Sequence, residues 1–402
     1  MMKKIIYSEL PSSDKGYYGL LAVVTAVIAI GLGAAYHMEH MGHYVTGMNN
    51  QIVWGMPHVF AIFLIVAASG ALNIASIGTV FGKTIYKPLG RLSSWLSVAL
   101  LIGGLAVLVL DLGHPDRLII AMTHNNFSSI FAWNIYFYVG FIAIVAVYMW
   151  FQMEKKMNIY SKSVGTLAFV WRLGLTTATG SIFGFLVARE AYDSAIMAPL
   201  FISMSFALGL AVFNITLLIL NSVANLQLGH RLIRRLCRLT GVFTAAVLYF
   251  GIIQHLTNLY AAEHDSVQAF ILFNGGIYTL LFWVGQIGLG AVLPLLIAFW
   301  PSDEYSHNRL AYLSVAICLG SFMTLYLIII GGQAWPLNLF PGMEVSSSFA
   351  DGSIANYSPS LPEILLGIGG LGLSALLVIV GLNVLKLLPK NLADSVIDPH
   401  AR

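Results

Sequence analysis

Charged residues and cysteines are scarce in this chain of 402 residues. Charged side chains make up 9% of it, whereas roughly a quarter is usual in soluble globular proteins, so a soluble globular domain is excluded. The two cysteines, Cys237 and Cys318, form no C-x-x-C motif. We therefore expect neither a disulfide nor an iron–sulfur cluster belonging to the chain itself. Alternation of apolar and polar residues with a period of two is also missing, which argues against a transmembrane β-barrel.

Hydrophobic residues fill 58% of the chain and give it a mean hydropathy of +0.83. They form runs of about 20 residues, long enough for a helix to cross a ~30 Å hydrocarbon layer. We predict an all-α integral membrane protein, a single polytopic domain over residues 1–402, with ten transmembrane helices and a disordered cytoplasmic tail at 389–402. The predicted spans are 17–36, 57–80, 92–111, 130–151, 164–187, 198–221, 240–260, 268–299, 310–331 and 361–388.

Lysine and arginine determine the predicted orientation. When the loops are assigned to alternate sides, 17 of the 20 Lys and Arg residues fall on the side of the N-terminus. Cytoplasmic loops carry the excess of these residues, so we expect a bacterial inner-membrane protein with both termini in the cytoplasm. The opposite, periplasmic side holds eight of the 11 histidines and is acidic. One explanation is simply that translocated loops lack Lys and Arg, so that other polar residues take their place.

The segment Asp111-Leu-Gly-His-Pro-Asp-Arg117 ends the third predicted span abruptly. Gly113 and Pro115 terminate the helix, which places Asp111 and His114 at its last turn, where the membrane interior meets water. A solvated interfacial turn would have the same sequence. The functional alternative gains support because other polar residues are predicted at the same level of the membrane.

Arg172 is the deepest predicted charge, about 15 Å along its helix from the cytoplasmic surface at 1.5 Å per residue. An ionisable group inside a membrane costs at least ~2.5–3.5 kcal/mol. Either its side chain reaches back to the cytoplasmic interface, or it is a fixed charge paired with a carboxylate in a proton path or lying beneath an anionic ligand. His58, one turn inside the second span after Pro57, and Asn73, near mid-depth, are each compatible with packing as well as with a polar path.

Two further polar segments are predicted at the periplasmic rim. The first, after the fifth span, contains Arg189, Glu190, Tyr192 and Asp193, and the second, opening the fourth span, contains Trp133 and Asn134. An Arg189–Glu190 surface pair would contribute little energy, and Trp133 also suits an aromatic belt. Collectively, however, these groups place proton acceptors around the mouth of an apolar bundle, which is what a quinol needs.

We therefore predict two overlapping sets of site residues and no metal site. The predicted quinone pocket comprises His58, Asp111, His114, Trp133, Asn134, Arg189 and Tyr192. The predicted proton-transfer residues are His58, Asp111, Arg172, Glu190 and Asp193.

Haem and zinc are the alternatives to a quinone. A b-type haem commonly needs two axial histidines on facing helices, and His58 and His255 are the conceivable pair. The motif His37-x-x-His40-x-x-His43 has a helical spacing that is compatible with zinc, but a solvated loop explains it better.

The segment at 111–117 resembles the Asp-Leu-Gly-x-Pro signature of the NrfD/polysulfide-reductase (PsrC-like) family of quinone-interacting membrane subunits. The similarity covers nearly the whole chain, including Trp54-Gly-Met-Pro-His-Val-Phe60, Lys87-Pro-Leu-Gly-Arg-Leu92, Phe131-Ala-Trp-Asn134 and Thr179-Gly-Ser-Ile-Phe-Gly-Phe-Leu-Val-Ala-Arg189. Within the family, the chain most resembles the DsrP subunits of sulfite-reduction-associated Dsr transmembrane complexes. It departs from the commonest form at His114, where Arg or another residue often precedes the proline.

This resemblance implies two four-helix bundles, spans 2–5 and 6–9, with spans 1 and 10 peripheral. It implies exchange of electrons with menaquinone or ubiquinone near the periplasmic face, no haem or iron–sulfur cluster in the chain itself, and no catalysis by the chain alone. The implied partners are a periplasmic ferredoxin-like iron–sulfur subunit, a multihaem cytochrome, a b-type cytochrome membrane subunit, a cytoplasmic iron–sulfur subunit and membrane lipid, but no nucleic acid. A secondary transporter or exporter that uses the same buried charges is the alternative function, and a scaffold for other subunits is a third.

Overall fold

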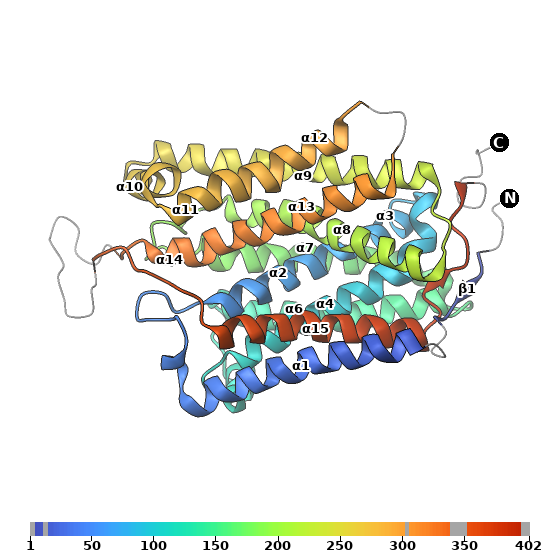
Figure 1. Cartoon of the computed structure of the whole chain (residues 1–402), viewed down its shortest axis with the longest axis horizontal. Helices are drawn as coiled ribbons and strands as arrows, with labels where there is room; N and C mark the ends of the chain where they lie inside the picture. The colour runs from blue at the N-terminus through green and yellow to red at the C-terminus, as the bar shows by residue number, and fades with distance from the viewer. Residues whose placement is uncertain (1–4, 11–14, 302–304, 338–351, 395–402) are drawn as a thin grey trace.

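The computed structural model describes residues 5–10, 15–301, 305–337 and 352–394, and this part of the chain is a set of long helices lying side by side (Figure 1). The long helices are α1 (Lys15–Met41), α2 (Met56–Ala71), α4 (Gly90–Leu110), α6 (Ile130–Met153), α7 (Ser161–Gly184), α8 (Met197–Ala224), α9 (His230–Tyr260), α13 (His307–Tyr326) and α15 (Leu361–Val384). Shorter α-helices are α3 (Asn73–Thr79), α5 (Leu118–Thr123), α10 (Asp265–Ala269), α11 (Ile277–Leu280), α12 (Leu293–Phe299) and α14 (Gly332–Ala334).

The described chain also contains 3₁₀ turns, π-helical segments and two short strands. The 3₁₀ turns are η1 (His43–Val45), η2 (Thr84–Leu89), η3 (Pro115–Arg117), η4 (Asn158–Tyr160) and η5 (Ala262–His264). The π-helical segments are η6 (Phe270–Asn274), η7 (Leu281–Val292) and η8 (Leu327–Gly331). The two strands, β1 (Tyr7–Ser8) and β2 (Leu388–Pro389), pair antiparallel.

The predicted all-α membrane class is confirmed. Among the described residues, nine helices are long and apolar enough to cross a membrane. The remaining predicted span, 164–187, corresponds to α7, which is 24 residues long but is more polar because it carries Arg172 and several threonines. Ten spans therefore stay a prediction.

The predicted eighth span, 268–299, is interrupted in the structure. The chain turns at Gly275 and Gly276, and Gly276 adopts φ +58°, a conformation that glycine reaches without steric cost. The segment before this turn forms α10 and η6, and the membrane-crossing helix begins only at Ile277.

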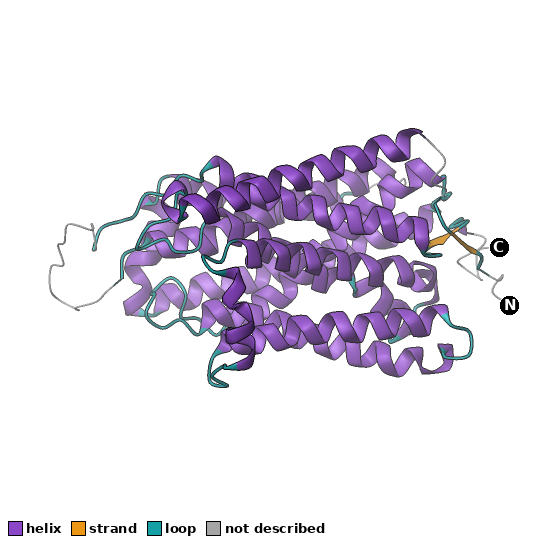
Figure 2. Cartoon of the chain, turned by 90° about the horizontal axis from the view of Figure 1, so that it is seen from below, coloured by secondary structure: helices purple, strands orange, loops and turns teal. Residues whose placement is uncertain are grey.

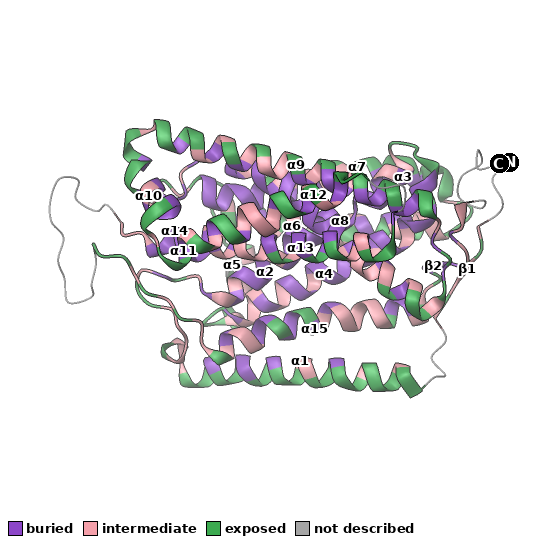
Figure 3. Ribbon diagram, turned by 45° about the horizontal axis from the view of Figure 1, so that its top comes forward, coloured by how far each residue is buried: buried purple, intermediate pink, exposed green. Residues whose placement is uncertain are grey.

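The predicted pair of four-helix bundles is confirmed by the packing of the helices. α2, α4, α6 and α7 contact one another in sequence and form the first bundle, while α8, α9, α12 with η7, and α13 form the second. The bundles meet where α2 and α7 pack against α8 and where α2 packs against α13. α15 packs beside α1 and against α4 (Figure 1). Figure 3 shows the buried residues concentrated in α2, α4, α8 and α13, whereas α1 is exposed along its outer side.

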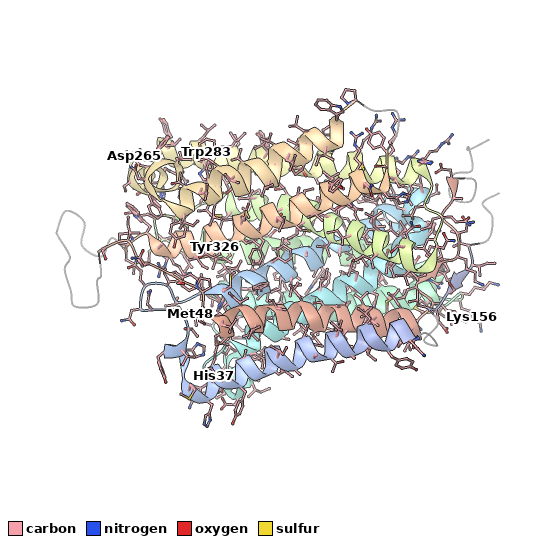
Figure 4. The ribbon with its side chains drawn as sticks, in the orientation of Figure 1. His37, Met48, Lys156, Asp265, Trp283 and Tyr326 are labelled. Carbon is pink, nitrogen blue, oxygen red and sulfur yellow. The ribbon has the colours of Figure 1, made fainter. Side chains whose placement is uncertain are left out.

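The two ends of the bundle differ in what they present. At one end, called the terminal end, β1 pairs with β2, so the first and last described segments of the chain lie together (Figure 2). We call the opposite end, where α2 begins and α4 stops, the His58 end. Figure 4 places His37, Met48 and Asp265 at the His58 end and Lys156 at the terminal end.

The expectation of a disordered tail from residue 389 was wrong for its first part. Leu392 is fully buried, and its backbone hydrogen-bonds both to Leu226 and to Gly229. Asp394 accepts a hydrogen bond from the backbone N–H of Arg231. The buried side chains of Leu388 and Leu392 hold this segment against the bundle. Residues 395–402 lie outside the described part of the chain.

The contact between α2 and α8 generates a stability prediction. Gly70 and Gly209 face each other there, and a Cβ atom added to either would overlap backbone atoms of the other helix. We expect Gly70→Leu to cost roughly 1–3 kcal/mol or more, as overpacking does in other cores, and to lower the thermal unfolding midpoint of the protein in detergent. Gly33→Leu on α1, where nothing lies within 4 Å, is the control and should leave the midpoint unchanged. Equal midpoints for the two variants would contradict this account of the bundle contact.

Candidate functional site

The candidate site centres on one pair of side chains at the His58 end of the first bundle. α2 begins at Met56, with Pro57 in its first turn, where a missing N–H is tolerated. Asp111 is the residue that follows the last turn of α4. Nδ1 of His58 lies 2.9 Å from Oδ2 of Asp111, and the two side chains are 22% and 1% exposed. A buried carboxylate therefore lies behind a partly accessible imidazole.

This pair is close, but it is not satisfied by hydrogen bonding. Nδ1 of His58 and both carboxylate oxygens of Asp111 make no well-aligned hydrogen bond to any residue in the described part of the chain. Buried polar groups normally find such partners, and a charged group left without one carries a substantial desolvation cost. Nδ1 of His58 and Oδ2 of Asp111 face each other, whereas Oδ1 of Asp111 has no hydrogen-bond partner in the described part of the chain, so the carboxylate keeps hydrogen-bonding capacity for a ligand that approaches past His58.

An aromatic wall stands beside the pair. The Trp54 ring stacks on the His58 ring at a centroid distance of 6.1 Å and on the Tyr192 ring at 6.4 Å. Phe183 and Phe131 meet the same indole edge-on, at 5.9 and 6.1 Å. Flat apolar surfaces next to a few polar groups are typical of small-molecule sites, and here they face the imidazole side of the pair.

Gln333 fixes the segment that carries Trp54. This fully buried side chain accepts hydrogen bonds from the N–H groups of Val53 and Trp54, each at 3.0 Å, and donates to the Trp54 carbonyl at 3.0 Å. Arg189 adds a second connection by donating to the carbonyl of Gln51 at 2.7 Å and to that of Gln333 at 3.3 Å. Residues 51–54 thus form an ordered loop that is tied to the second bundle.

Glu363 and Tyr357 fix the start of α2. The buried Glu363 carboxylate accepts from the N–H groups of Gly47 and Ser360, at 2.8 and 2.7 Å, and from the Tyr357 hydroxyl at 2.7 Å. The Tyr357 oxygen in turn accepts from the N–H of Met56 at 2.7 Å. Burial and the Glu363 carboxylate raise the pKa of Tyr357, so its hydroxyl remains a donor. This chain of bonds ends two residues before His58.

Arg189 and Tyr192 are the predicted pocket residues that the structure brings to this site besides the pair. Tyr192 is fully buried and its hydroxyl donates to the Ile329 carbonyl at 2.7 Å. Burial raises the pKa of Tyr192 and lowers the pKa of Arg189. Tyr192 contributes the face of its ring to the site. The Arg189 guanidinium is bonded to backbone carbonyls, so neither residue offers a free polar group to a ligand.

Glu190 and Asp193 share the same loop but have other surroundings. Oε2 of Glu190 accepts from the Trp335 indole at 3.0 Å, and the Glu190 carbonyl lies 2.6 Å from Nδ1 of His264. Asp193 is half-buried. These contacts of Glu190 join the loop to the second bundle.

The other three predicted pocket residues either point away from the pair or bind other parts of the protein. Trp133 is 45% exposed and donates from its indole to the Phe127 carbonyl at 2.9 Å, within an outer aromatic cluster. The amide of Asn134 donates to the Ala178 carbonyl at 3.1 Å and so joins α6 to α7. The side chain of His114 is 65% exposed and lies 3.7 Å from a carboxylate oxygen of Asp116.

Arg172 lies deep between α2, α7 and α8, and it is 1% exposed. It does not reach back to an interface, nor does it form an ion pair with any described carboxylate. Its Nη1 donates to the Ser69 carbonyl at 2.9 Å, and its guanidinium lies 5.0 and 4.7 Å from the ring centroids of Phe169 and Phe206. Asn73 donates nearby, from Nδ2 to the Phe206 carbonyl at 3.1 Å.

The histidines considered for haem or zinc have separate settings. His255 belongs to the second bundle, where its Nδ1 lies 2.8 Å from Oε1 of Gln268, whereas His58 faces Asp111 in the first. His40 stacks on Tyr36 in α1, and His43 lies beyond that helix in η1. Over the described residues, no three metal-binding side chains gather into a ligand set.

Three residues with clear roles were not singled out from the sequence. Trp54 lies just before the second apolar run, where an aromatic residue has no specific signal, and Gln333 follows two glycines at the end of another run. Glu363 had the clearest signal, because Ser360-Leu-Pro-Glu363 has the spacing of a capping box. Their partners lie far away in sequence, which no local pattern reveals.

Comparison with known proteins gives a consistent result. The family model described as "Polysulphide reductase, NrfD" matches residues 44–336. The chain is 28% identical over 396 residues to the "Hdr-like menaquinol oxidoreductase integral membrane subunit" of Archaeoglobus fulgidus, covering 98% of this chain and 99% of that protein. It is 26% identical to a putative dimethyl sulfoxide reductase membrane subunit of Halobacterium salinarum (96% and 94% covered) and 23% identical to a selenate reductase subunit of Mesobacillus selenatarsenatis (92% and 94% covered).

The role of Gln333 gives a prediction for the site. Gln333→Leu leaves two N–H groups and one carbonyl of residues 53–54 without partners, so the segment should open locally and its amide hydrogen exchange should accelerate by roughly tenfold or more, since each lost buried bond is worth about 1–3 kcal/mol. Exchange read by mass spectrometry on peptides covering 51–54 is the measurement. Gln286→Leu, on η7 in the second bundle, is the matched control, and unchanged exchange in both variants would rule out the bracing role.

Proposed function

Because this chain belongs to the polysulphide reductase, NrfD family, we propose that it is the quinol-binding membrane subunit of a multisubunit oxidoreductase, with the quinol ring at His58 and Asp111. The observation that carries the proposal is the buried Asp111 carboxylate, whose oxygens lack hydrogen bonds within the described chain. The names of the relatives support it, since one is a menaquinol oxidoreductase membrane subunit and two are subunits of reductases, one of them in the membrane.

The pair fits the chemistry of a quinol. Oxidation of a quinol to a quinone releases two protons and two electrons. Asp111 would accept a hydrogen bond from one hydroxyl group and then its proton, while His58, which touches the carboxylate and is partly exposed, would hand protons on toward water. In quinone reduction the same two groups would deliver protons. The electrons would pass to or from a partner subunit, so the chain alone would not complete the reaction.

The aromatic wall would orient the ring. A quinol placed against Trp54 lies beside His58, because the indole stacks on that imidazole. Gln333, Arg189 and the Tyr357–Glu363 chain hold this wall and the start of α2 in fixed positions. Fixed positions lower the ordering cost of binding. The ring could be that of menaquinone or of ubiquinone, and the name of the menaquinol oxidoreductase relative favours menaquinone.

The orientation in the membrane follows from charge. With Lys and Arg concentrated at the terminal end, that end would face the cytoplasm of a bacterial cell and both termini would lie inside. The His58 end would then face the periplasm and dock a ferredoxin-like iron–sulfur subunit. By the Dsr-type resemblance, a multihaem cytochrome, a b-type cytochrome membrane subunit and a cytoplasmic iron–sulfur subunit would complete the complex.

A proton path could extend inward along α2. Ser69 and Asn73 lie 11 and 15 residues beyond His58, or about 16 and 22 Å along a helix. Arg172 contacts the first through its carbonyl, and Asn73 lies against the same Phe206 backbone and ring region. Movement of protons along these groups would make quinol turnover generate a membrane potential.

The first test is binding at the pair. We expect a fluorescent quinol-site inhibitor to bind the purified chain saturably, and Asp111→Asn or His58→Ala to raise its Kd by roughly tenfold or more, because a hydrogen bond to a charged group is worth about 1.5–3 kcal/mol. Asp116→Asn is the control, since that carboxylate is largely exposed. An unchanged Kd in the Asp111 and His58 variants would move the site elsewhere. No binding at all would favour a transporter or scaffold, and a b-type band in the visible spectrum would favour haem.

The second test concerns Arg172. In proteoliposomes that contain the whole complex, Arg172→Leu should leave quinol oxidation running while the membrane potential formed per quinol falls severalfold, because the fixed charge of the inward path is gone. Arg172→Lys keeps the charge and should retain more of the potential. If Arg172→Leu leaves both quinol oxidation and the potential unchanged, the inward path is wrong.

A further inference from the structure

A second feature lies at the edge of the first bundle, next to the candidate pair. α1, α4 and α15 leave a hollow of about 40 Å³ between them. Its lining is entirely apolar, made of Ile, Leu, Val, Ala and Gly residues only. No lining side chain can donate or accept a hydrogen bond, so the chemistry of the hollow suits a hydrocarbon chain and excludes a polar ligand.

The hollow is a groove with a closed floor and an open rim. Gly31, Val107 and Leu366 of its lining are buried, whereas Leu32 is 51% exposed on the outer side of α1. In a membrane, that outer side faces lipid. A chain lying in the groove would therefore pass from the bundle interior to the hydrocarbon layer without crossing a helix.

Glycines determine the shape of the groove. Gly31 of α1 and Gly369 of α15 let these helices meet backbone to backbone, since a Cβ atom built on either glycine would overlap the Cα of the other, and a Cβ atom built on Gly370 would overlap the Val107 side chain. Larger residues at these positions would push the helices apart and change the groove. α1 and α15, although outside both four-helix bundles, thus shape a space beside the candidate site.

The groove is continuous with the His58–Asp111 pair. Leu110, which lines its upper end, immediately precedes Asp111. Ala61, one helical turn beyond His58, packs in one apolar cluster with Val107 and Leu366. A ring bound at the pair would therefore have the groove below it, along the membrane normal.

We propose that this groove holds the isoprenoid tail of the quinol whose ring lies at His58 and Asp111. The inference rests on the proposed function and adds the route by which the tail enters, between α1 and α4, because α15 packs against both of these helices and forms the floor of the groove. A phospholipid acyl chain is the competing occupant. It is disfavoured because a lipid phosphate above the groove would lie next to the Asp111 carboxylate, and like charges repel.

The test is photolabelling of the full chain, purified with its accompanying subunits and placed in lipid nanodiscs. The probe is a menaquinone analogue with a diazirine on its second isoprene unit. We expect peptides of α1, α4 and α15 to be labelled, and excess quinol-site inhibitor to remove that label. Ala106→Phe places a phenyl ring in the groove. It should reduce the label roughly tenfold, because the ring and an isoprenoid tail cannot occupy the same space without overpacking. Ala143→Phe, at an exposed position of α6, is the matched control and should not.

The possible outcomes distinguish a failure of the tail groove from a failure of the proposed quinol-binding function. Inhibitor-sensitive label on α6, α7 or the second bundle would overturn the groove while leaving the quinol site in place. Undiminished label in Ala106→Phe would overturn it as well. Labelling of the groove by a diazirine phospholipid that the quinol-site inhibitor fails to displace would assign the groove to lipid. Absence of any inhibitor-sensitive label, together with no inhibitor binding, would reject the proposed function itself.

Discussion

The lack of water inside a membrane is the constraint on which this structure depends. Buried polar groups must find partners within the protein, and most of those near the site do. Gln333 bonds to the chain at residues 53 and 54, Asn134 joins α6 to α7, and the Tyr192 hydroxyl meets a carbonyl of η8. Against that background the Asp111 carboxylate is an exception, since it is buried and, among the described residues, has an imidazole as its one charged or polar side-chain partner. This exception is the reason for proposing the pair as the place of a ligand.

The same constraint explains why residues distant in sequence hold the site. The backbone N–H groups of the loop before α2 need hydrogen-bond acceptors, because water is scarce near the membrane interior. Neighbouring residues in the chain do not supply acceptors for all of them. Gln333 and Glu363, roughly 280 and 316 positions away, supply them instead. The loop therefore becomes rigid only when α14 and α15 are in place. Two helices outside the first bundle, α14 and α15, thus hold the loop that leads into the candidate site.

The sequence allowed prediction of what depends on local pattern. Apolar runs predicted the helices, and the residues that end them, Asp111 and Pro57 among them, predicted the level of the site. His58 and Asp111 could be assigned to one site because both were expected at one depth, but their direct contact was not predicted. The positions of His114 and Trp133 could not be foreseen, because depth alone does not say whether a side chain turns toward the bundle or outward. Gln333 escaped notice because one amide in an apolar segment has no periodicity. The break at Gly275 was missed because an over-long apolar run hides it.

Arg172 remains the most demanding residue to explain. The helix of α2 is interrupted at Leu72 before α3 begins, and such a break frees backbone groups that neighbours must satisfy. Ser93 meets two of them, donating to the Ala71 carbonyl and accepting from the Ala75 N–H, and Arg172 meets the Ser69 carbonyl. A neutral donor would serve that carbonyl at lower cost than a buried guanidinium. Among the described residues, two aromatic rings and one carbonyl contact the guanidinium. The cost of a positive charge at this depth is the reason for proposing that the charge itself has a use, which the inward proton path would supply.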